Sequence, residues 1–279
     1  MDKEPRLIRL AVFGKPVAHS LSPRIHGLFA AQFGLPLDYR AIEADAKRFA
    51  RRVARFAQEG GRGCNVTVPL KREAWKLATE RSPGAQRAQA VNTLLFREDD
   101  TWFGDNTDGE GLVRDLERAF AGGLADRRIC LLGAGGAAAG VLGALLEAAP
   151  GAVVLVNRTP ARAEDLAARH SDLGRVETCS FEQTSKAGPF DLLVNATSMG
   201  HAGSAPPLER GWFKAGGLCY DMNYGKASEP LQAVCLTLGV RACDGLGMLV
   251  EQAALSFQLW TGLQASTTPV LDELRRSLG

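Results

Sequence analysis

Short apolar runs alternate with longer segments of helical pattern along the first part of the chain. The apolar runs predict four strands, at residues 8–13, 37–42, 63–68 and 91–96. Helices are predicted to begin near Pro23, Ala46 and Lys71. Strands that alternate with helices are typical of βαβ units with a largely parallel sheet. The pattern therefore predicts an N-terminal α/β domain that is mainly parallel.

A second alternation of the same kind follows. It begins with a predicted helix at residues 109–120 and continues with strands at Ile129, Val153, Leu192 and residues 218–221. From Asp244-Gly245 onward the pattern is helical and too short to fold alone. We therefore predict a first domain at 1–107, a second at 108–243, and C-terminal helices at 244–279 that pack back on the first domain.

The first strand of the second domain runs into a glycine-rich turn, residues 133–138. It fits the pattern GxGxxG/A at Gly133, Gly135 and Ala138. Such a turn brings the backbone and a helix N-terminus to a dinucleotide pyrophosphate, which predicts a Rossmann-type domain. Glycine-rich turns also serve plain strand-to-helix packing, so this pattern alone leaves both interpretations open.

The end of the next strand favours NADP. An acidic residue there typically bonds the adenosine ribose, but this chain has Asn157-Arg158-Thr159-Pro160-Ala161-Arg162. Two arginines suit the extra 2′-phosphate of NADP. Thr159 and Pro160 also suit a helix start, which is compatible with binding. The segment 195–200 follows another strand and is either part of the ligand site or an ordinary polar turn with an Asx bond.

Polar clusters in the first domain suggest a substrate site. Ser22 suits an N-cap with Pro23 as the first helical residue, whereas Ser20 has no such need; two hydroxyls at a helix N-terminus suit a carboxylate. We assign no chemistry to His19 or His26.

The segment 64–71 leads to a lysine at the end of a predicted strand. Strand alternation directs Cys64, Val66 and Val68 to the core, while Asn65 and Thr67 share the other face.

Lys71 is either a solvated helix start or a proton donor, because a lysine is ordinarily protonated at neutral pH. Asp108 is either a helix cap or the partner that orients Lys71. Together the two would exchange the proton that accompanies hydride transfer to a ketone.

Composition narrows the function further. The 33 basic and 31 acidic residues nearly cancel, which argues against nucleic acid and membrane partners and favours a small-molecule substrate. Six cysteines without a CxxC pair argue against disulfides and a zinc site, so no metal is expected. The N-terminus lacks the apolar core of a signal peptide, and glycines interrupt the uncharged stretch 129–146. We expect a cytoplasmic protein.

In these residues and motifs the chain resembles the shikimate dehydrogenase family over nearly its whole length. The matching segments are 12–14, 18–23, 65–71, 90–93, 104–109, 133–137, 157–159, 195–198, 220–222 and 245–249. The resemblance implies an oxidoreductase that uses NADP for the reversible reduction of 3-dehydroshikimate to shikimate, in aromatic amino-acid biosynthesis.

The resemblance also implies roles for particular residues. Ser20 and Ser22 would hold the substrate carboxylate, with Tyr224 nearby, and Lys71 with Asp108 would be the catalytic pair. The substrate ring would be surrounded by Asn65, Thr67, Lys71, Asn92, Asp108 and Gln252. The cofactor would be held by Gly133, Ala134, Gly135, Gly136, Ala137, Asn157, Arg158, Thr159, Arg162, Thr197, Met222 and Gly245.

The chain departs from the family pattern after residue 222, where Lys226 and Glu229 stand at unusual places near Tyr224. Glu251 is a further charge beside Gln252 and is expected to face away from the pocket. Two alternatives stay open: a dehydrogenase of broader quinate and shikimate specificity, and a non-catalytic ligand-sensing module on the same fold. A homodimer is a possible assembly.

Overall fold

The computed structural model describes residues 7–99, 101–120 and 123–278. The chain divides into two compact units. Residues 1–107 and 250–279 make up the first, and residues 108–249 make up the second. The helical C-terminal segment thus belongs with the N-terminal sheet, and the division falls inside the long helix α10 (Leu246–Thr261).

The first unit is built on a six-stranded sheet in the order β2-β1-β3-β5-β6-β4, and only β5 runs antiparallel to its neighbours. Its elements are β1 (Ile8–Gly14), α1 (Ser22–Gln32), β2 (Leu37–Glu43), α2 (Ala46–Gln58), β3 (Gly63–Val66), α3 (Lys71–Leu77), β4 (Glu80–Arg81), α4 (Pro83–Ala88), β5 (Thr93–Phe96), β6 (Trp102–Asp105), most of α10, and α11 (Thr268–Leu278).

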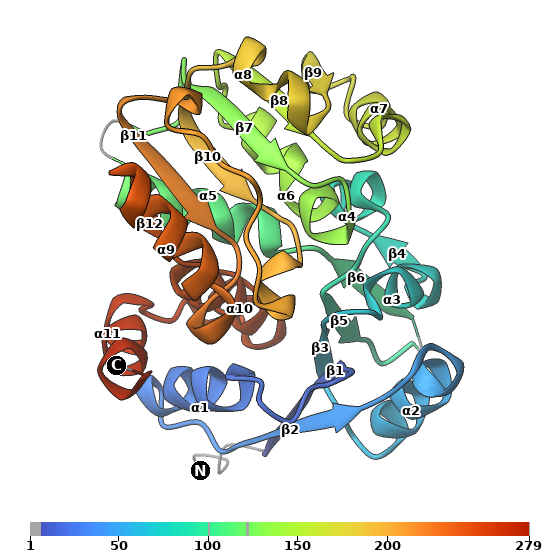
Figure 1. The fold of residues 1–279 in the computed structure, drawn as a ribbon. Coiled ribbons are helices and arrows are strands. Elements are labelled where there is room, and N and C mark those ends of the chain that lie inside the picture. The colour runs from blue at the N-terminus through green and yellow to red at the C-terminus, as the bar shows by residue number, and fades with distance from the viewer. Residues whose placement is uncertain (1–6, 100, 121–122, 279) are drawn as a thin grey trace. The chain divides into compact units, whose positions relative to one another are not determined.

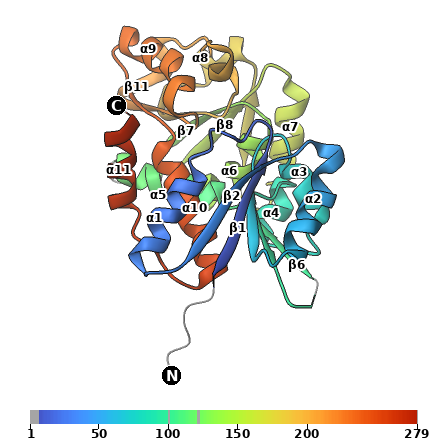
Figure 2. The same ribbon diagram turned by 90° about the horizontal axis from the view of Figure 1, so that it is seen from below.

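Helices cover both faces of this sheet, as Figure 2 shows from below. On one face, Phe49 of α2 meets Phe13 of β1 edge to face, with ring centroids 5.9 Å apart. On the other face, Phe29 of α1 lies against Phe257 of α10 at 5.7 Å. The indole of Trp260 donates to the carbonyl oxygen of Leu94 at 2.9 Å, which ties α10 to β5. The C-terminal helices therefore pack on the first sheet, as predicted.

The second unit has a six-stranded, all-parallel sheet in the order β12-β11-β10-β7-β8-β9 (Figure 1). This is the doubly wound order of dinucleotide-binding domains. Its elements are α5 (Asp108–Ala119), β7 (Arg128–Leu132), α6 (Gly136–Glu147), β8 (Ala152–Val156), α7 (Pro160–Ala168), β9 (Val176–Cys179), η1 (Phe181–Gln183), α8 (Thr184–Ala187), β10 (Phe190–Asn195), η2 (Met199–Ala202), η3 (Arg210–Trp212), β11 (Phe213–Asp221), η4 (Gly225–Ala227), α9 (Glu229–Leu238) and β12 (Arg241–Cys243).

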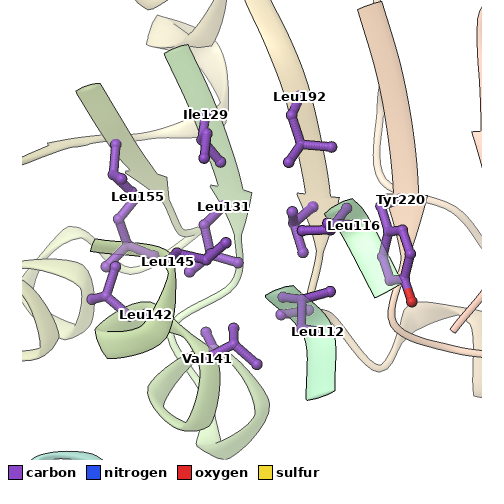
Figure 3. Close-up of a cluster of buried hydrophobic side chains, with 14 of the residues drawn as sticks. Leu112, Leu116, Ile129, Leu131, Val141, Leu142, Leu145, Leu155, Leu192 and Tyr220 are labelled. Carbon is purple, nitrogen blue, oxygen red and sulfur yellow. The ribbon is translucent and has the colours of Figure 1, made fainter. Parts of the chain in front are cut away.

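Buried leucine, isoleucine and valine side chains from α5, α6 and the strands fill one face of this sheet (Figure 3). Leu112 and Leu116 of α5, with Leu142 and Leu145 of α6, are fully buried against the strands. The opposite face holds a separate cluster that includes Leu231 and Cys235 of α9. Because both faces are covered, the strands are apolar along most of their length, as parallel strands usually are.

Two local expectations are wrong. The strand predicted at 63–68 ends at Val66, and a turn closed by the Leu70 N–H on the Thr67 carbonyl oxygen carries Val68 outward, where it is 67% exposed. Helix α1 begins at Ser22, so Leu21 occupies the cap position and no side chain caps the helix. In the described part of the chain, no helix combines the length and the apolar character needed to cross a membrane.

Candidate active site

The serine pair lies in the loop that leads into α1. The Ser20 hydroxyl accepts the backbone N–H of Ser22 at 3.2 Å and donates to the Ser22 hydroxyl at 3.1 Å. Neither hydroxyl is used as a helix cap, contrary to the interpretation of Ser22 from the sequence. Two adjacent hydroxyls at an uncapped helix N-terminus provide donors that suit a carboxylate.

The end of β3 presents Asn65 to a buried polar cluster. Its Oδ1 accepts the Tyr39 hydroxyl proton at 2.7 Å and lies 3.1 Å from Nε2 of His26. Its Nδ2 lies 3.0 to 3.2 Å from three oxygens, those of the Asn92 carbonyl, the Thr93 hydroxyl and the Ser256 hydroxyl. Cys64 and Val66 lie in the apolar core, so the predicted alternation of faces is confirmed as far as Val66.

Asn92 connects three segments of the first unit. Its Oδ1 accepts from the Thr107 backbone N–H at 3.0 Å and from the Thr93 hydroxyl at 2.9 Å. Its Nδ2 donates to Thr107 Oγ1 at 2.9 Å and to Gln252 Oε1 at 3.3 Å. We call the residues joined in this way the substrate network: Asn65, Asn92, Thr93, Thr107, Gln252 and Ser256.

Lys71 and Asp108 each open a helix. Lys71 is the first residue of α3, half-buried, and its carbonyl oxygen accepts the Val91 N–H at 2.9 Å. Asp108 is the first residue of α5 and is buried. It directly follows Thr107, whose N–H is held by Asn92. Lys71 belongs to the first unit and Asp108 to the second, so their predicted pairing stays a prediction.

The glycine turn follows β7 in the second unit. Gly133 has a φ of +104°, which favours glycine, and its N–H donates to the Val156 carbonyl oxygen at 2.8 Å. Gly135 occupies the cap position of α6 without a side-chain hydrogen bond. No atom lies within 4 Å of a Cβ built on Gly135 or Gly136. The turn therefore leaves open space and uncapped N–H groups at a helix N-terminus, which fits a pyrophosphate.

The segment after β8 presents two cations beside this turn. The Asn157 Oδ1 accepts the Ala134 N–H at 3.2 Å, which joins the segment to the glycine turn. Arg158 and Arg162 are exposed, and within the described residues no ion pair occupies either guanidinium. Thr159 occupies the cap position of α7, although its side chain makes no capping bond, and Pro160 opens the helix, as the helix-start interpretation predicts. The two guanidinium groups fit the 2′-phosphate of NADP.

The carboxyl ends of β10 and β11 are joined by polar side chains. Asn195 Oδ1 accepts from the Thr197 N–H at 3.1 Å, which is the Asx turn that the sequence left open. Asn195 Nδ2 donates to Asp221 Oδ1 at 3.0 Å, and Asn223 Nδ2 donates to the same oxygen at 2.8 Å. Burial raises the pKa of Asp221, and the hydrogen bonds from Asn223 and Asn195 oppose that rise.

Met222 and Gly245 lie at the same end of the second sheet. The Met222 N–H donates to the Asn195 carbonyl oxygen at 3.0 Å, and the Gly245 N–H donates to that of Asn223 at 2.9 Å. A Cβ at Gly245 would collide with the Met222 carbonyl oxygen, so this position needs glycine. One hydrogen-bonded group thus brings together the three residues that are expected to contact the nicotinamide, namely Thr197, Met222 and Gly245.

The unusual loop after Met222 holds Tyr224 half-buried, and burial raises the pKa of its hydroxyl. Lys226 and Glu229 are exposed. In the first unit, the Glu251 carboxylate accepts the Thr267 hydroxyl proton at 2.6 Å, whereas its neighbour Gln252 joins the substrate network. Glu251 therefore faces away from that network, as expected.

Sequence reasoning missed several polar residues of these clusters: Tyr39, Thr93, Thr107, Ser256, Asp221 and Asn223. A signal existed for Ser256, which stands four residues after Gln252 and so shares its helix face. The Ser256 hydroxyl donates to the Gln252 carbonyl oxygen at 3.1 Å.

The fold and these clusters define a two-unit α/β protein with a dinucleotide-type glycine turn in one unit and a polar, serine-edged network in the other. Three family models match the chain: the shikimate dehydrogenase substrate binding domain at residues 12–94, the shikimate / quinate 5-dehydrogenase model at 115–203, and the shikimate 5'-dehydrogenase C-terminal domain at 245–275.

Individual relatives agree with these models. Shikimate dehydrogenase (NADP(+)) of Nitrosococcus oceani is 45% identical over 97% of this chain and 96% of its own length. The enzyme of the same name from Methylococcus capsulatus is 50% identical over 95% of each chain. The structure of shikimate 5-dehydrogenase from Thermus thermophilus with NADP(H) and shikimate has a TM-score of 0.83 and 35% identity, over 97% of this chain and 100% of that one. The chain belongs to the shikimate dehydrogenase family.

Proposed function

We propose that the chain is an NADP-dependent shikimate dehydrogenase, which reversibly reduces 3-dehydroshikimate to shikimate in aromatic amino-acid biosynthesis. The observation that carries this function is the full-length likeness to relatives of that name. The residues that we assign to the reaction come from both units. The alternatives of a broader quinate specificity and of a non-catalytic sensor are not favoured.

NADPH supplies the hydride when the ketone is reduced, NADP⁺ accepts it in the reverse direction, and the second unit has residues that would hold this cofactor. The open glycine turn would receive the pyrophosphate through its backbone N–H groups. Arg158 and Arg162 would hold the 2′-phosphate, with Asn157 and Thr159 beside the adenosine. Thr197, Met222 and Gly245 would line the nicotinamide.

The first unit would bind the substrate by its carboxylate and its ring hydroxyls. Ser20 and Ser22 offer two hydroxyl donors for the carboxylate, and Tyr224 of the second unit would lie near it. The ring hydroxyls would meet Thr67, Lys71 and the residues of the substrate network that the family resemblance singles out, namely Asn65, Asn92 and Gln252.

Lys71 and Asp108 would handle the proton. When the ketone is reduced, its carbon receives the hydride and its oxygen receives a proton from the Lys71 ammonium group. In the reverse direction the lysine accepts the proton of the shikimate hydroxyl. The Asp108 carboxylate would favour the charged form of the lysine and orient it.

A paired assay tests the function. The purified chain is mixed with NADP and either shikimate or quinate, and with NAD in place of NADP, and nicotinamide reduction is followed by absorbance. We expect the highest kcat/KM for shikimate with NADP. If the chain oxidises neither acid, the proposal is wrong. If it uses quinate as well as it uses shikimate, the broader specificity replaces the proposal.

Two further expectations complete the proposal: a cytoplasmic location and a homodimer. The six cysteines are free thiols, which suits a reducing compartment. Fractionation of cells that express the chain tests the location, and light scattering of the purified chain tests the assembly.

A further inference from the structure

His26 contacts Asn65, one of the candidate substrate residues of the first unit, and has no assigned role. It is fully buried on α1, and its ring stacks on that of Tyr39 with centroids 4.6 Å apart and planes 10° apart. The rings of Trp260 and Phe257 on α10 lie against the same imidazole, at 5.3 and 6.2 Å. This packing holds the imidazole in one place.

The hydrogen bonds of Asn65 determine which nitrogen of the His26 imidazole carries the proton. The Asn92 carbonyl oxygen only accepts, so the Asn65 atom 3.2 Å from it is the amide nitrogen, and Oδ1 faces the other way. That Oδ1 lies 3.1 Å from His26 Nε2. Because Oδ1 also only accepts, Nε2 carries the proton and donates it.

The other ring nitrogen has no such partner. No hydrogen-bond partner among the described residues reaches His26 Nδ1, which is buried. Burial lowers the pKa of His26 to about 3, and the hydrogen bond with Asn65 offsets only part of that fall. The imidazole is therefore neutral at ordinary pH, with a bare nitrogen in the core. A phenylalanine ring would fill the space without that cost, so the Nε2–H is what the histidine contributes.

This donor completes the hydrogen bonding of Asn65. The carboxamide oxygen accepts from His26 and from Tyr39, which fills both of its acceptor positions. The amide nitrogen faces only oxygens of the substrate network. Loss of a donor would let the carboxamide rotate and release the Asn92 carbonyl oxygen.

We propose that His26 is a positioning residue of the substrate site: with Tyr39 it holds the Asn65 carboxamide in one orientation, and Asn65 in turn holds Asn92. This role rests on the proposed function, because Asn65 and Asn92 are among the residues assigned to the ring hydroxyls.

Three variants separate the donor from the ring. His26→Phe keeps an aromatic ring and loses the donor, His26→Gln keeps an N–H donor and loses the ring, and Tyr39→Phe removes the second donor to Asn65. We expect His26→Phe and Tyr39→Phe each to raise the KM for shikimate about 3- to 10-fold. The KM for NADP should stay unchanged. His26→Gln should raise the KM for shikimate less than His26→Phe does, because it keeps an N–H donor. Because both donors act on one oxygen, the effects of the two substitutions should not be additive. The double variant His26→Phe/Tyr39→Phe should raise the KM for shikimate by less than the product of the two single increases.

The matched control is His170→Gln. His170 is a buried histidine of the second unit, where its Nδ1 lies 3.0 Å from the Leu166 carbonyl oxygen. We expect this variant to lower thermal stability without any selective change in the KM for shikimate. Thermal denaturation of every variant shows which of them are folded.

The wild-type assay is read first, because it tests the proposed function by itself. If the wild type oxidises shikimate but a folded His26→Phe keeps its KM for shikimate, the positioning role is wrong. Equal rises in the KM for shikimate and for NADP would also overturn it, since they indicate general damage. If His26→Phe does not fold, the other two variants decide. The positioning role is wrong if Tyr39→Phe keeps a normal KM for shikimate, or if neither Tyr39→Phe nor His26→Gln changes this KM selectively.

Discussion

The candidate substrate site and the candidate cofactor site are built by different means. In the first unit, side chains bond to other side chains in a buried network, so each holds its neighbour. In the second unit, the glycine turn offers backbone N–H groups and open space, and the two arginines project into solvent. A change in the first site should therefore propagate through several residues, whereas a change in the glycine turn or in its two arginines should act where it is made.

The largest effect is expected at the proposed proton donor. Lys71→Ala should lower kcat about 10²- to 10⁴-fold, the usual contribution of general acid–base catalysis. Shikimate should still bind, because the serine pair and the substrate network stay in place. Stopped-flow turnover and calorimetric binding check the two halves of this expectation.

Lys76→Ala is the matched control for this variant, since Lys76 lies on the same helix and pairs only with Glu73 among the described residues. It should keep wild-type turnover. Unchanged turnover in Lys71→Ala would contradict the assigned chemistry.

The buried histidine behind the substrate network should make the free energy of unfolding depend on pH. The pKa of His26 is lowered from 6.5 to about 3 in the folded chain. Between these values the unfolded chain binds the extra proton, so the free energy of unfolding should fall as the pH drops, by about 1.4 kcal/mol per pH unit. His26→Gln should lack this contribution. Denaturant unfolding at pH 7, 6 and 5 measures both slopes, and parallel slopes would contradict the prediction.

The contrast between the two sites also explains what the sequence could predict. The glycine turn directly follows β7 and Arg158 directly follows β8, so local pattern was enough to locate both at the ends of strands, and their contacts with the cofactor stay a prediction. The substrate network joins Asn65 of β3, Asn92 before β5 and Ser256 of α10, which are far apart in the sequence. His26 was set aside for the same reason: nothing near it in the sequence points to Asn65.

Local pattern also failed where a turn decided the outcome. Val68 has the alternation of a core residue, but the strand ends two residues earlier and the turn exposes it. Ser22 has the sequence context of a helix cap, but the helix begins at Ser22 itself. Helix and strand ends depend on tertiary contacts, so they are less predictable from the sequence than the elements themselves.

A cofactor-selectivity effect should be confined to the second unit. Arg158→Ala should raise the KM for NADP about tenfold and leave the KM for NAD unchanged, because an exposed guanidinium contributes only a modest charge-assisted bond to the phosphate. The KM for shikimate should not change. Arg175→Ala is the control, since Arg175 is another exposed arginine of this unit. If Arg158→Ala raises the KM values for NADP and NAD equally, Arg158 does not bind the 2′-phosphate.

The smallest effects compare two glycines of one turn. Gly133 has a φ of +104°, and a Cβ there would lie 3.2 Å from the Ala196 carbonyl oxygen, so Gly133→Ala should lower the free energy of unfolding. The expected loss is about 1–2 kcal/mol, the usual cost of a side chain at positive φ.

Gly135 has a φ of −93° and open space around it, so Gly135→Ala should leave the melting temperature unchanged and weaken NADP binding alone. Differential scanning calorimetry with and without NADP separates the two outcomes. If Gly135→Ala binds NADP normally, the pyrophosphate does not approach the backbone at this glycine. The cofactor site would then depend on its arginines rather than on the open turn.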